Sequence, residues 1–101
     1  MVREINGLNE LKEVITTNKK VLVDIWAVWC GPCKMLSPIV DKVAEDNKDL
    51  CVIKVNIDDN EDIANTFGVE AIPTLLVFED GKLVDQNVGF IPENKVKELV
   101  K

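Results

Sequence analysis

The sequence predicts an α/β fold organised around a mixed β-sheet. Apolar segments of strand length alternate with segments whose apolar residues recur at helical spacing, an order typical of βαβ units. Two segments, 21–26 and 50–57, are almost continuously apolar, as expected of strands covered on both faces. Nearer the C-terminus, two further strand patterns flank Asp80-Gly81, a strong hairpin signal. Parallel pairing early and antiparallel pairing late together give a mixed sheet.

The N-terminal segment predicts a strand, a helix and a second strand. Residues 2–5 form a short edge strand in this prediction, and Asn6 caps the helix that follows. The inward face of that helix carries Leu8, Leu11, Val14 and Ile15. The helix is expected to end within residues 16–18, where Thr and Asn favour local hydrogen bonds over helix. The buried strand 21–26 comes next.

The middle of the chain predicts helix, strand and helix. The first helix runs from Cys30 to about Asn47 and contains Pro38, which removes an intrahelical hydrogen bond and should kink it. The strand 50–57 follows. A short helix from Glu61 to Phe67 then ends at Gly68, a residue suited to a left-handed helix terminus.

The C-terminal part predicts a hairpin and a last helix. Strands 74–78 and 83–88 form the hairpin, and Gly89 ends the second strand. Pro92 suits the first turn of the final helix, whose inward residues are Val96, Leu99 and Val100. The predicted order is β-α-β-α-β-α-β-β-α, and the length of 101 residues predicts a single domain, 1–101.

Composition narrows the classes of partner. A net charge of −6, from 18 acidic and 12 basic residues, opposes binding to polyphosphate, so no nucleic-acid partner is expected. No segment approaches the roughly 18 apolar residues of a membrane span, and Met1–Glu4 lacks the apolar stretch of a signal peptide. We therefore expect a cytoplasmic monomer without membrane contact.

Two cysteines three residues apart mark the candidate active site. Cys30 and Cys33 stand where an apolar strand gives way to a helix. Unpaired N–H groups and the helix dipole at that end favour thiolate over thiol, so the pKa of Cys30 should fall. Helix neighbours at this spacing have Cβ atoms about 5–6 Å apart, against about 3.8 Å in a disulfide, so slight tightening would close the pair. Pro32 stiffens this turn, and Gly31 permits close approach of another chain.

Two other uses of the pair fit less well than reversible redox chemistry. A disulfide closing so short a loop stabilises a fold by only about 2 kcal/mol, against about 4.7 kcal/mol for a 100-residue loop. Structural zinc usually needs four Cys or His ligands, but the chain has no histidine and one further cysteine, Cys51, so no metal is expected. Cys51 begins a buried strand and is expected to be a core residue, with a regulatory or dimer-forming thiol as the alternative.

Asp24 is the one charged residue in the strand 21–26. A buried carboxylate usually raises its pKa or finds a partner. Strand periodicity places Asp24 on one face with Leu22 and Trp26, and Lys54 on the next parallel strand is a candidate partner. The functional interpretation is a proton relay for Cys33, which must become a thiolate to resolve a mixed disulfide. The alternative is that Asp24 reaches solvent at a strand end.

The segment Trp26-Ala27-Val28-Trp29-Cys30-Gly31-Pro32-Cys33-Lys34 resembles the active-site signature of the thioredoxin family. The resemblance covers essentially the whole chain and implies a central five-stranded mixed sheet flanked by four helices. Asp24 matches the family's buried acid, Lys54 a lysine often near it, and Pro38 the helix-kinking proline. Ile72-Pro73-Thr74 matches the segment that carries the family's cis-proline, whereas the residues alone favour trans, since only about 5–6% of X–Pro bonds are cis.

The resemblance implies a protein-disulfide reductase and electron carrier that contributes to cell redox homeostasis. Cys30 would attack the target disulfide and Cys33 would resolve the mixed disulfide. A shallow apolar groove for extended partner segments would be formed by Trp29, Ile72, Pro73 and Gly89. No cofactor is expected beyond the Cys30–Cys33 disulfide. A separate thioredoxin reductase would supply electrons, since the chain has no Gly-X-Gly-X-X-Gly fingerprint.

Two rival functions remain open from the sequence. The first is an oxidase or isomerase of an oxidising compartment, which would differ in reduction potential. The second is a binding module that keeps the fold as a subunit of a larger assembly. An intact Cys30-Gly31-Pro32-Cys33 is compatible with both.

Overall fold

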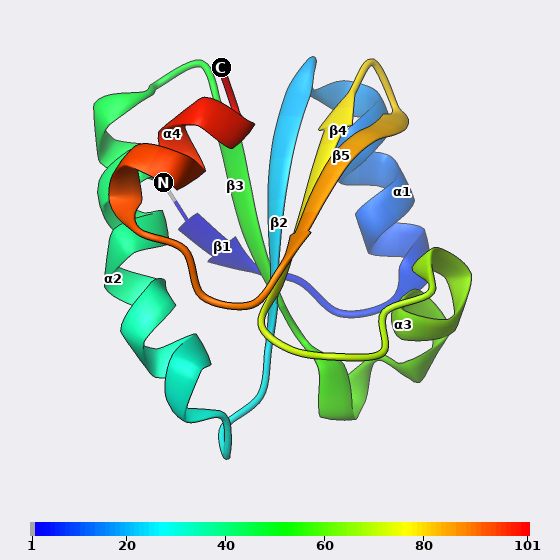
Figure 1. Ribbon diagram of the computed structural model, residues 1–101. Helices are drawn as coiled ribbons and strands as arrows, with labels where there is room; N and C mark the ends of the chain where they lie inside the picture. Colours follow the sequence, from blue (N-terminus) through cyan, green and yellow to red (C-terminus); the bar gives the residue numbers. More distant parts are fainter. Residues whose placement is uncertain (1) are drawn as a thin grey trace.

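The computed structural model describes residues 2–101, which form one five-stranded sheet with four α-helices on its two faces (Figure 1). The strands are β1 (Val2–Glu4), β2 (Lys20–Trp26), β3 (Cys51–Asn56), β4 (Thr74–Glu79) and β5 (Lys82–Val88). The helices are α1 (Leu8–Thr17), α2 (Gly31–Asp46), α3 (Glu61–Phe67) and α4 (Glu93–Leu99), with a 3₁₀ turn at Ile57–Asp59. In the part of the chain that the structure describes, no helix has the length and apolar character to cross a membrane.

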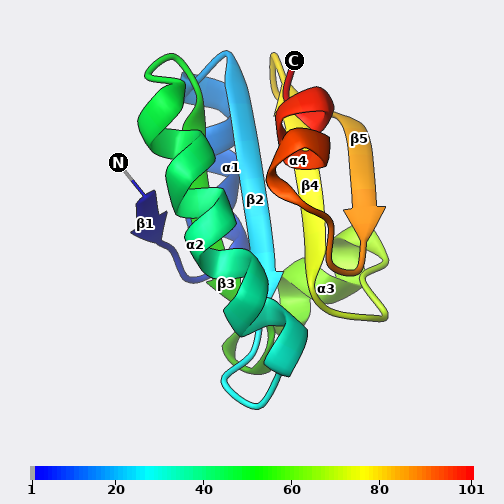
Figure 2. The same ribbon diagram turned by 60° about the vertical axis from the view of Figure 1, so that its left-hand side comes forward.

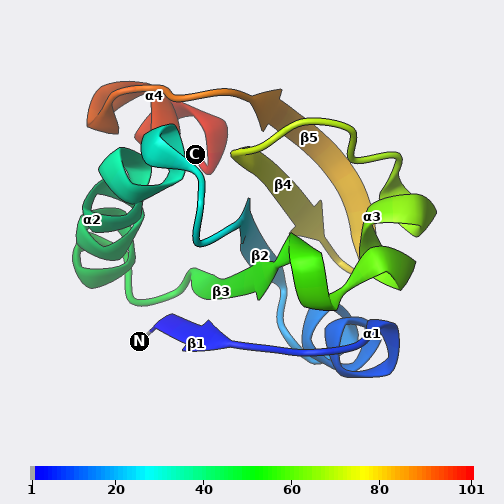
Figure 3. The ribbon, with the colours of Figure 1, turned by 90° about the horizontal axis from the view of Figure 1, so that it is seen from below.

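The order of the strands is β1-β3-β2-β4-β5. β3 runs parallel to both β1 and β2, while β4 is antiparallel to β2 and β5 is antiparallel to β4. The expected mixed sheet is therefore confirmed. Because of these directions, the carboxyl ends of β2, β3 and β5 meet the amino end of β4 at one edge of the sheet. This is the lower edge in Figure 1 and the near side in Figure 3.

Helices cover both faces of the sheet: α1 and α3 lie on one side, α2 and α4 on the other (Figures 1 and 2). β2 serves both cores, because alternate side chains point to opposite faces. Val21, Val23 and Ile25 belong to the core under α1 and α3. Leu22 belongs to the core under α2 and α4, so Asp24 points to that second side.

Phe78 of β4 supports the core under α1 and α3, where its ring meets the edge of Phe67 at a centroid distance of 5.3 Å. We expect Phe78→Ala to lower the free energy of unfolding by about 3–5 kcal/mol, because the substitution leaves a cavity in the buried core. Urea denaturation measures this change. Phe90→Ala, at a half-exposed ring, should cost less than about 1 kcal/mol, and an equal loss for both variants would contradict the assignment.

The start of α1 differs from the prediction. The residue that precedes the helix is Gly7, with φ 90° and no side-chain cap, so the expected cap by Asn6 is wrong. The Asn6 side chain instead accepts a hydrogen bond from the buried side chain of Asn60 at 3.3 Å. Asn60 also accepts from the Gly7 N–H at 2.7 Å. The backbone at the start of α1 is thus bonded by distant side chains, since Leu8 N–H also donates to Asp62 Oδ2 at 3.0 Å, and no local pattern could reveal these contacts.

Several further boundaries differ from the prediction by one residue. β3 ends at Asn56, and the 3₁₀ turn that follows was not predicted. Pro92 lies just before α4 instead of inside its first turn. The hairpin between β4 and β5 is confirmed, and its two central residues, Asp80 and Gly81, both have positive φ values of 53° and 82°. Such values fit the tight turn whose twist matches that of antiparallel strands.

Candidate active site

Cys30 stands at the amino end of α2, where a backbone N–H group meets its sulfur. It is the N-cap residue, and Gly31 and Pro32 form the start of the first helical turn. The backbone N–H of Cys33 donates to Cys30 Sγ at 3.2 Å. Such a donor and the positive end of the helix dipole both stabilise negative charge on the sulfur. The location therefore favours the thiolate form of Cys30 whenever the pair is reduced.

Cys30 and Cys33 form a disulfide in this structure, with Cα atoms 5.3 Å apart. Both residues are almost buried, 3% and 4% exposed, and they form a small apolar cluster with Ala27. The cluster is covered in part by Trp26, Ile57 and Ile72. Cys51 is a free, half-buried thiol that packs against the core under α1 and α3. Among residues 2–101, no group of three or more metal-ligating side chains gathers.

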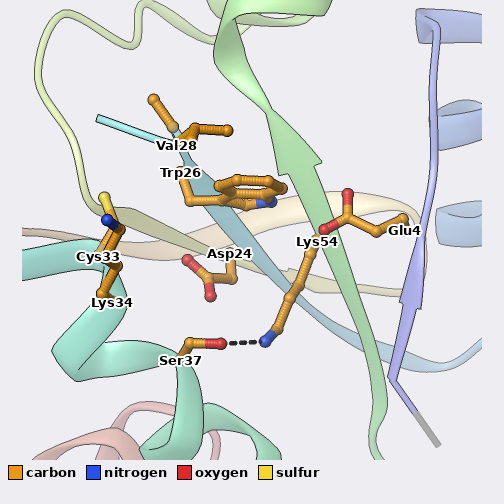
Figure 4. Close-up of a pocket in the computed structure, with 9 residues that line it drawn as sticks. Glu4, Asp24, Trp26, Val28, Cys33, Lys34, Ser37 and Lys54 are labelled. Atoms are coloured by element: carbon orange, nitrogen blue, oxygen red, sulfur yellow. Dashed lines mark hydrogen bonds between the residues drawn. The ribbon is translucent and has the colours of Figure 1, made fainter. Parts of the chain in front are cut away.

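A cavity of about 300 Å³ lies behind Cys33 (Figure 4). It is bounded by α2 on one side and by β1, β2 and β3 on the other, as Figure 4 shows. Its lining residues are Glu4, Asp24, Trp26, Ala27, Val28, Cys33, Lys34, Ser37 and Lys54. The cavity therefore brings the second cysteine together with the buried acid that the sequence singled out.

Asp24 is 1% exposed, so the alternative in which it reaches solvent at a strand end is wrong. Its Oδ1 has no hydrogen-bond partner among residues 2–101. Burial raises the pKa of Asp24 from 3.8 to about 7; the Lys54 ammonium opposes this rise, and the Glu4 and Asp41 carboxylates add to it. Asp24 thus exchanges a proton near neutral pH.

Lys54 lies opposite Asp24 in the register of β2 and β3, as strand periodicity indicated. Its ammonium, however, contacts helix α2 instead of Asp24. Nζ donates to Ser37 Oγ at 2.5 Å and forms an ion pair with Asp41 Oδ1 at 3.0 Å (Figure 4 draws the first contact). The expected partnership between Asp24 and Lys54 is therefore one of neighbouring charges, without a direct bond.

The sequence interpretation missed Ser37 and Glu4, which line this cavity, and Asp41, which pairs with Lys54. Ser37 and Asp41 follow Cys33 by four and eight residues, a spacing that places all three on one face of a helix, so a signal was present. Glu4 is the register partner of Lys54 on its other side, in β1. Partial burial raises the pKa of Glu4, while the nearby Trp26 indole and Lys54 lower it. The Trp26 N–H does not reach hydrogen-bond geometry with that carboxylate.

The proposed groove residues lie on the other side of the disulfide. The Ile72–Pro73 bond is cis, as the resemblance implied, so the trans expectation is wrong, since base rates cannot decide a bond that tertiary context fixes. The Gly89 N–H donates to the Pro73 carbonyl at 2.8 Å, which joins the end of β5 to the segment before β4. Trp29 is 70% exposed, and its indole N–H donates to Asp58 Oδ2 at 2.9 Å. This contact with Asp58 was not predicted from the sequence.

Comparison with known proteins places this site in a family. The family model described as Thioredoxin matches residues 3–101. The chain belongs to the thioredoxin family. It is 46% identical over 100 residues to a thioredoxin of Mycoplasmoides gallisepticum, which covers 99% of this chain and 100% of the relative. It is 43% identical to a thioredoxin of Mycoplasma genitalium, with 98% and 97% of the two chains covered.

Solved thioredoxin structures have the same architecture. A mutant thioredoxin from Halobacterium salinarum superposes with a TM-score of 0.94 at 40% identity, covering 98% of this chain and 87% of the other. The oxidised mitochondrial thioredoxin 3 of Saccharomyces cerevisiae gives a TM-score of 0.91 at 33% identity, with 97% and 92% covered. This thioredoxin-family chain is accordingly a thiol–disulfide reductase, and its redox centre is the Cys30–Cys33 pair.

Proposed function

We propose that Cys30 is the attacking thiol and Cys33 the resolving thiol of the reductase cycle, with Asp24 as the proton acceptor for Cys33. One observation carries this assignment. Cys33, and not Cys30, is among the residues that line the cavity with Asp24. Cys30 has a backbone donor, the Cys33 N–H, and the helix dipole, which support a thiolate without a separate base. The two cysteines would therefore become thiolates in different ways: Cys30 through the amino end of α2, and Cys33 through proton transfer to Asp24.

The chemistry runs in two exchange steps. In the first, the Cys30 thiolate attacks one sulfur of the substrate disulfide; a Cys30–substrate disulfide forms, the substrate S–S bond breaks, and the leaving sulfur takes up a proton from water. In the second, Cys33 gives its proton to the Asp24 carboxylate and attacks Cys30 Sγ. The Cys30–Cys33 disulfide forms, the second substrate sulfur leaves and is protonated, and the substrate has gained two electrons.

The acid–base properties of Asp24 suit this role. A general base works best when its pKa lies near the operating pH, because it is then both deprotonated in many molecules and basic enough to accept a proton. Burial brings the pKa of Asp24 to about 7, so much of the population carries the carboxylate at neutral pH. Asp24 is thus the acceptor in the second step.

The partner surface in this proposal comprises Trp29, Ile72, Pro73 and Gly89. Trp29 offers an exposed indole that the Asp58 carboxylate holds in place. Trp29 and Ile72 both line a surface hollow of about 570 Å³. The hollow combines apolar residues with the carboxylates of Asp58, Glu61 and Glu70 at its wall. An extended protein segment carrying a disulfide could lie along it, and recognition through backbone suits a broad range of substrate proteins.

The same proposal covers the setting in which the protein works. Each turnover leaves Cys30–Cys33 oxidised, so an external thioredoxin reductase must return two electrons, and the sequence carries no nucleotide fingerprint of its own. One free cysteine beside one cycling pair suits the reducing cytoplasm better than a secreted disulfide framework. We place the protein there as a monomer in which residues 1–101 act as a single domain.

Trapping experiments test the order of attack. Cys33→Ser should accumulate a mixed disulfide between Cys30 and a substrate such as insulin, because no resolving thiol remains. Cys30→Ser should give no such adduct. Both variants are made with Cys51→Ser, so that no third thiol contributes, and non-reducing electrophoresis with mass spectrometry identifies the bonded cysteine. An adduct at Cys33 in the Cys30→Ser protein would reverse the assignment.

A further inference from the structure

Lys54 stands between two carboxylates and contacts only one of them. Its neighbour in the sheet register is Asp24, which has an unpartnered Oδ1, and both residues line the same cavity. The ammonium nevertheless extends to α2, where it meets Ser37 (Figure 4) and, one turn further along the helix, Asp41. Because Lys54 pairs with Asp41, the Asp24 carboxylate has no cation in direct contact.

We propose that Ser37 and Asp41 are positioning residues that hold the Lys54 ammonium on α2 and so keep Asp24 unpaired as the proton acceptor for Cys33. This inference rests on the role proposed above for Asp24. We refer to the Ser37–Lys54–Asp41 contacts as the α2 latch. Ser37 supplies a neutral acceptor and Asp41 a charged one, from successive turns of the same helix face as Cys33.

Without the α2 latch, the Lys54 ammonium could pair with Asp24 instead of Asp41. Adjacent strands are about 4.8 Å apart, so a lysine opposite an aspartate on one face can turn its ammonium to that carboxylate. Because Asp24 is almost completely buried, such a pair strongly favours the ionised carboxylate. An Asp24 carboxylate paired in this way would remain deprotonated but would be a weak base. Cys33 would then lose its proton more slowly.

The charged and titratable groups that face Asp24 are few among the described residues. The charges that act on Asp24 are Lys54 on β3, Glu4 on β1 and Asp41 on α2. Cys33 and Lys34 line the same cavity from the first turns of α2. Lys54 is the cation whose position the α2 latch controls. Its side chain is 13% exposed whereas that of Asp41 is 51% exposed, so the ammonium is held at the solvent side of the cavity.

The test follows the Asp24 carboxyl directly, by ¹³C NMR titration of the oxidised protein. Opening the latch with the double substitution Ser37→Ala and Asp41→Asn should lower the titration midpoint of Asp24 by about one pH unit, because Asp24 gains a close cation and also loses the neighbouring Asp41 charge, which raises its pKa. Ser37→Ala alone should lower it in part, while Ser37→Thr, which keeps the hydroxyl, should restore the original midpoint. Neither site is in the buried core, so the variants should fold.

Two controls separate the latch from a general change in charge. Asp46→Asn removes the same charge from the same helix, at a carboxylate paired with Lys42 and Lys97, and should leave the midpoint unchanged. In a Lys54→Met background, Ser37→Ala should also have no effect, because the cation is gone. An unchanged midpoint in the double variant, or an equal shift with and without Lys54, would overturn the proposal.

A kinetic measurement distinguishes failure of the latch from failure of the Asp24 role. The pH profile of the resolution step, followed by tryptophan fluorescence in stopped flow, should move with the NMR midpoint. If the midpoint shifts and the rate profile does not, the latch stands and Asp24 is not the proton acceptor. If the midpoint does not shift, the latch is refuted whatever the rates show.

Discussion

A Cys30→Ser variant is expected to reduce insulin at least about 10³-fold more slowly than the unmodified protein when dithiothreitol supplies electrons, because loss of a nucleophile removes the covalent route itself. A serine hydroxyl at the N-terminus of α2 does not ionise near neutral pH and cannot form a disulfide. The turbidity of precipitating insulin chains measures the rate, after subtraction of the rate with dithiothreitol alone.

The matched control is Cys51→Ser, which removes the other thiol and lies outside the redox cluster. This variant should retain the full rate, because Cys51 packs against the core under α1 and α3. If Cys30→Ser kept the full rate, or if Cys51→Ser lost as much as Cys30→Ser, the reducing centre would have to lie elsewhere.

Asp24→Asn should have the second large effect, stabilising the fold at high pH while slowing resolution. The folded pKa of about 7 lies above the ordinary value of 3.8, so the folded state holds this proton more tightly than the unfolded state. The contribution of Asp24 to stability is therefore present below about pH 4 and is lost as the pH rises through 7. A difference of about three pH units corresponds to about 4 kcal/mol. Because asparagine does not ionise, Asp24→Asn removes this loss of stability at high pH.

Urea denaturation at pH 4 and pH 8 measures the stability difference. The gain of Asp24→Asn over the parent should be small at pH 4 and about 2–4 kcal/mol at pH 8. The variant should also resolve mixed disulfides at least about 10²-fold more slowly, a typical loss when a general base is removed. Asp49→Asn, at an exposed position before β3, should change neither quantity. Unchanged turnover together with lower stability would refute the proposed role.

The sequence predicted much of the architecture because the signals involved are local. Continuous apolar segments gave β2 and β3, Asp80-Gly81 gave the hairpin, and Gly68 gave the end of α3, where it adopts a left-handed conformation. The pair Cys30–Cys33 and the burial of Asp24 followed from spacing and from a single charge in an apolar strand.

What the sequence did not predict depends on contacts between distant segments. The cap of α1 was misassigned because Asn60, far along the chain, takes the polar contacts near Asn6. Strand periodicity placed Lys54 beside Asp24, yet periodicity cannot say which of two carboxylates a flexible ammonium reaches. That choice depends on how α2 lies over the sheet.

In the proposed mechanism, proton transfer and partner binding take place on different sides of the disulfide. A docked protein would cover the side of the disulfide where Trp29 is exposed, whereas Asp24 lies in the cavity behind Cys33, whose lining includes the exposed residues Glu4 and Lys34. Electrons would thus cross one side of the redox centre and protons the other. If Asp24 accepts the Cys33 proton as proposed, a docked partner would not need to leave a channel for that proton. The pH at which this protein turns over fastest would then be set by its own residues and would be the same for all of its partners.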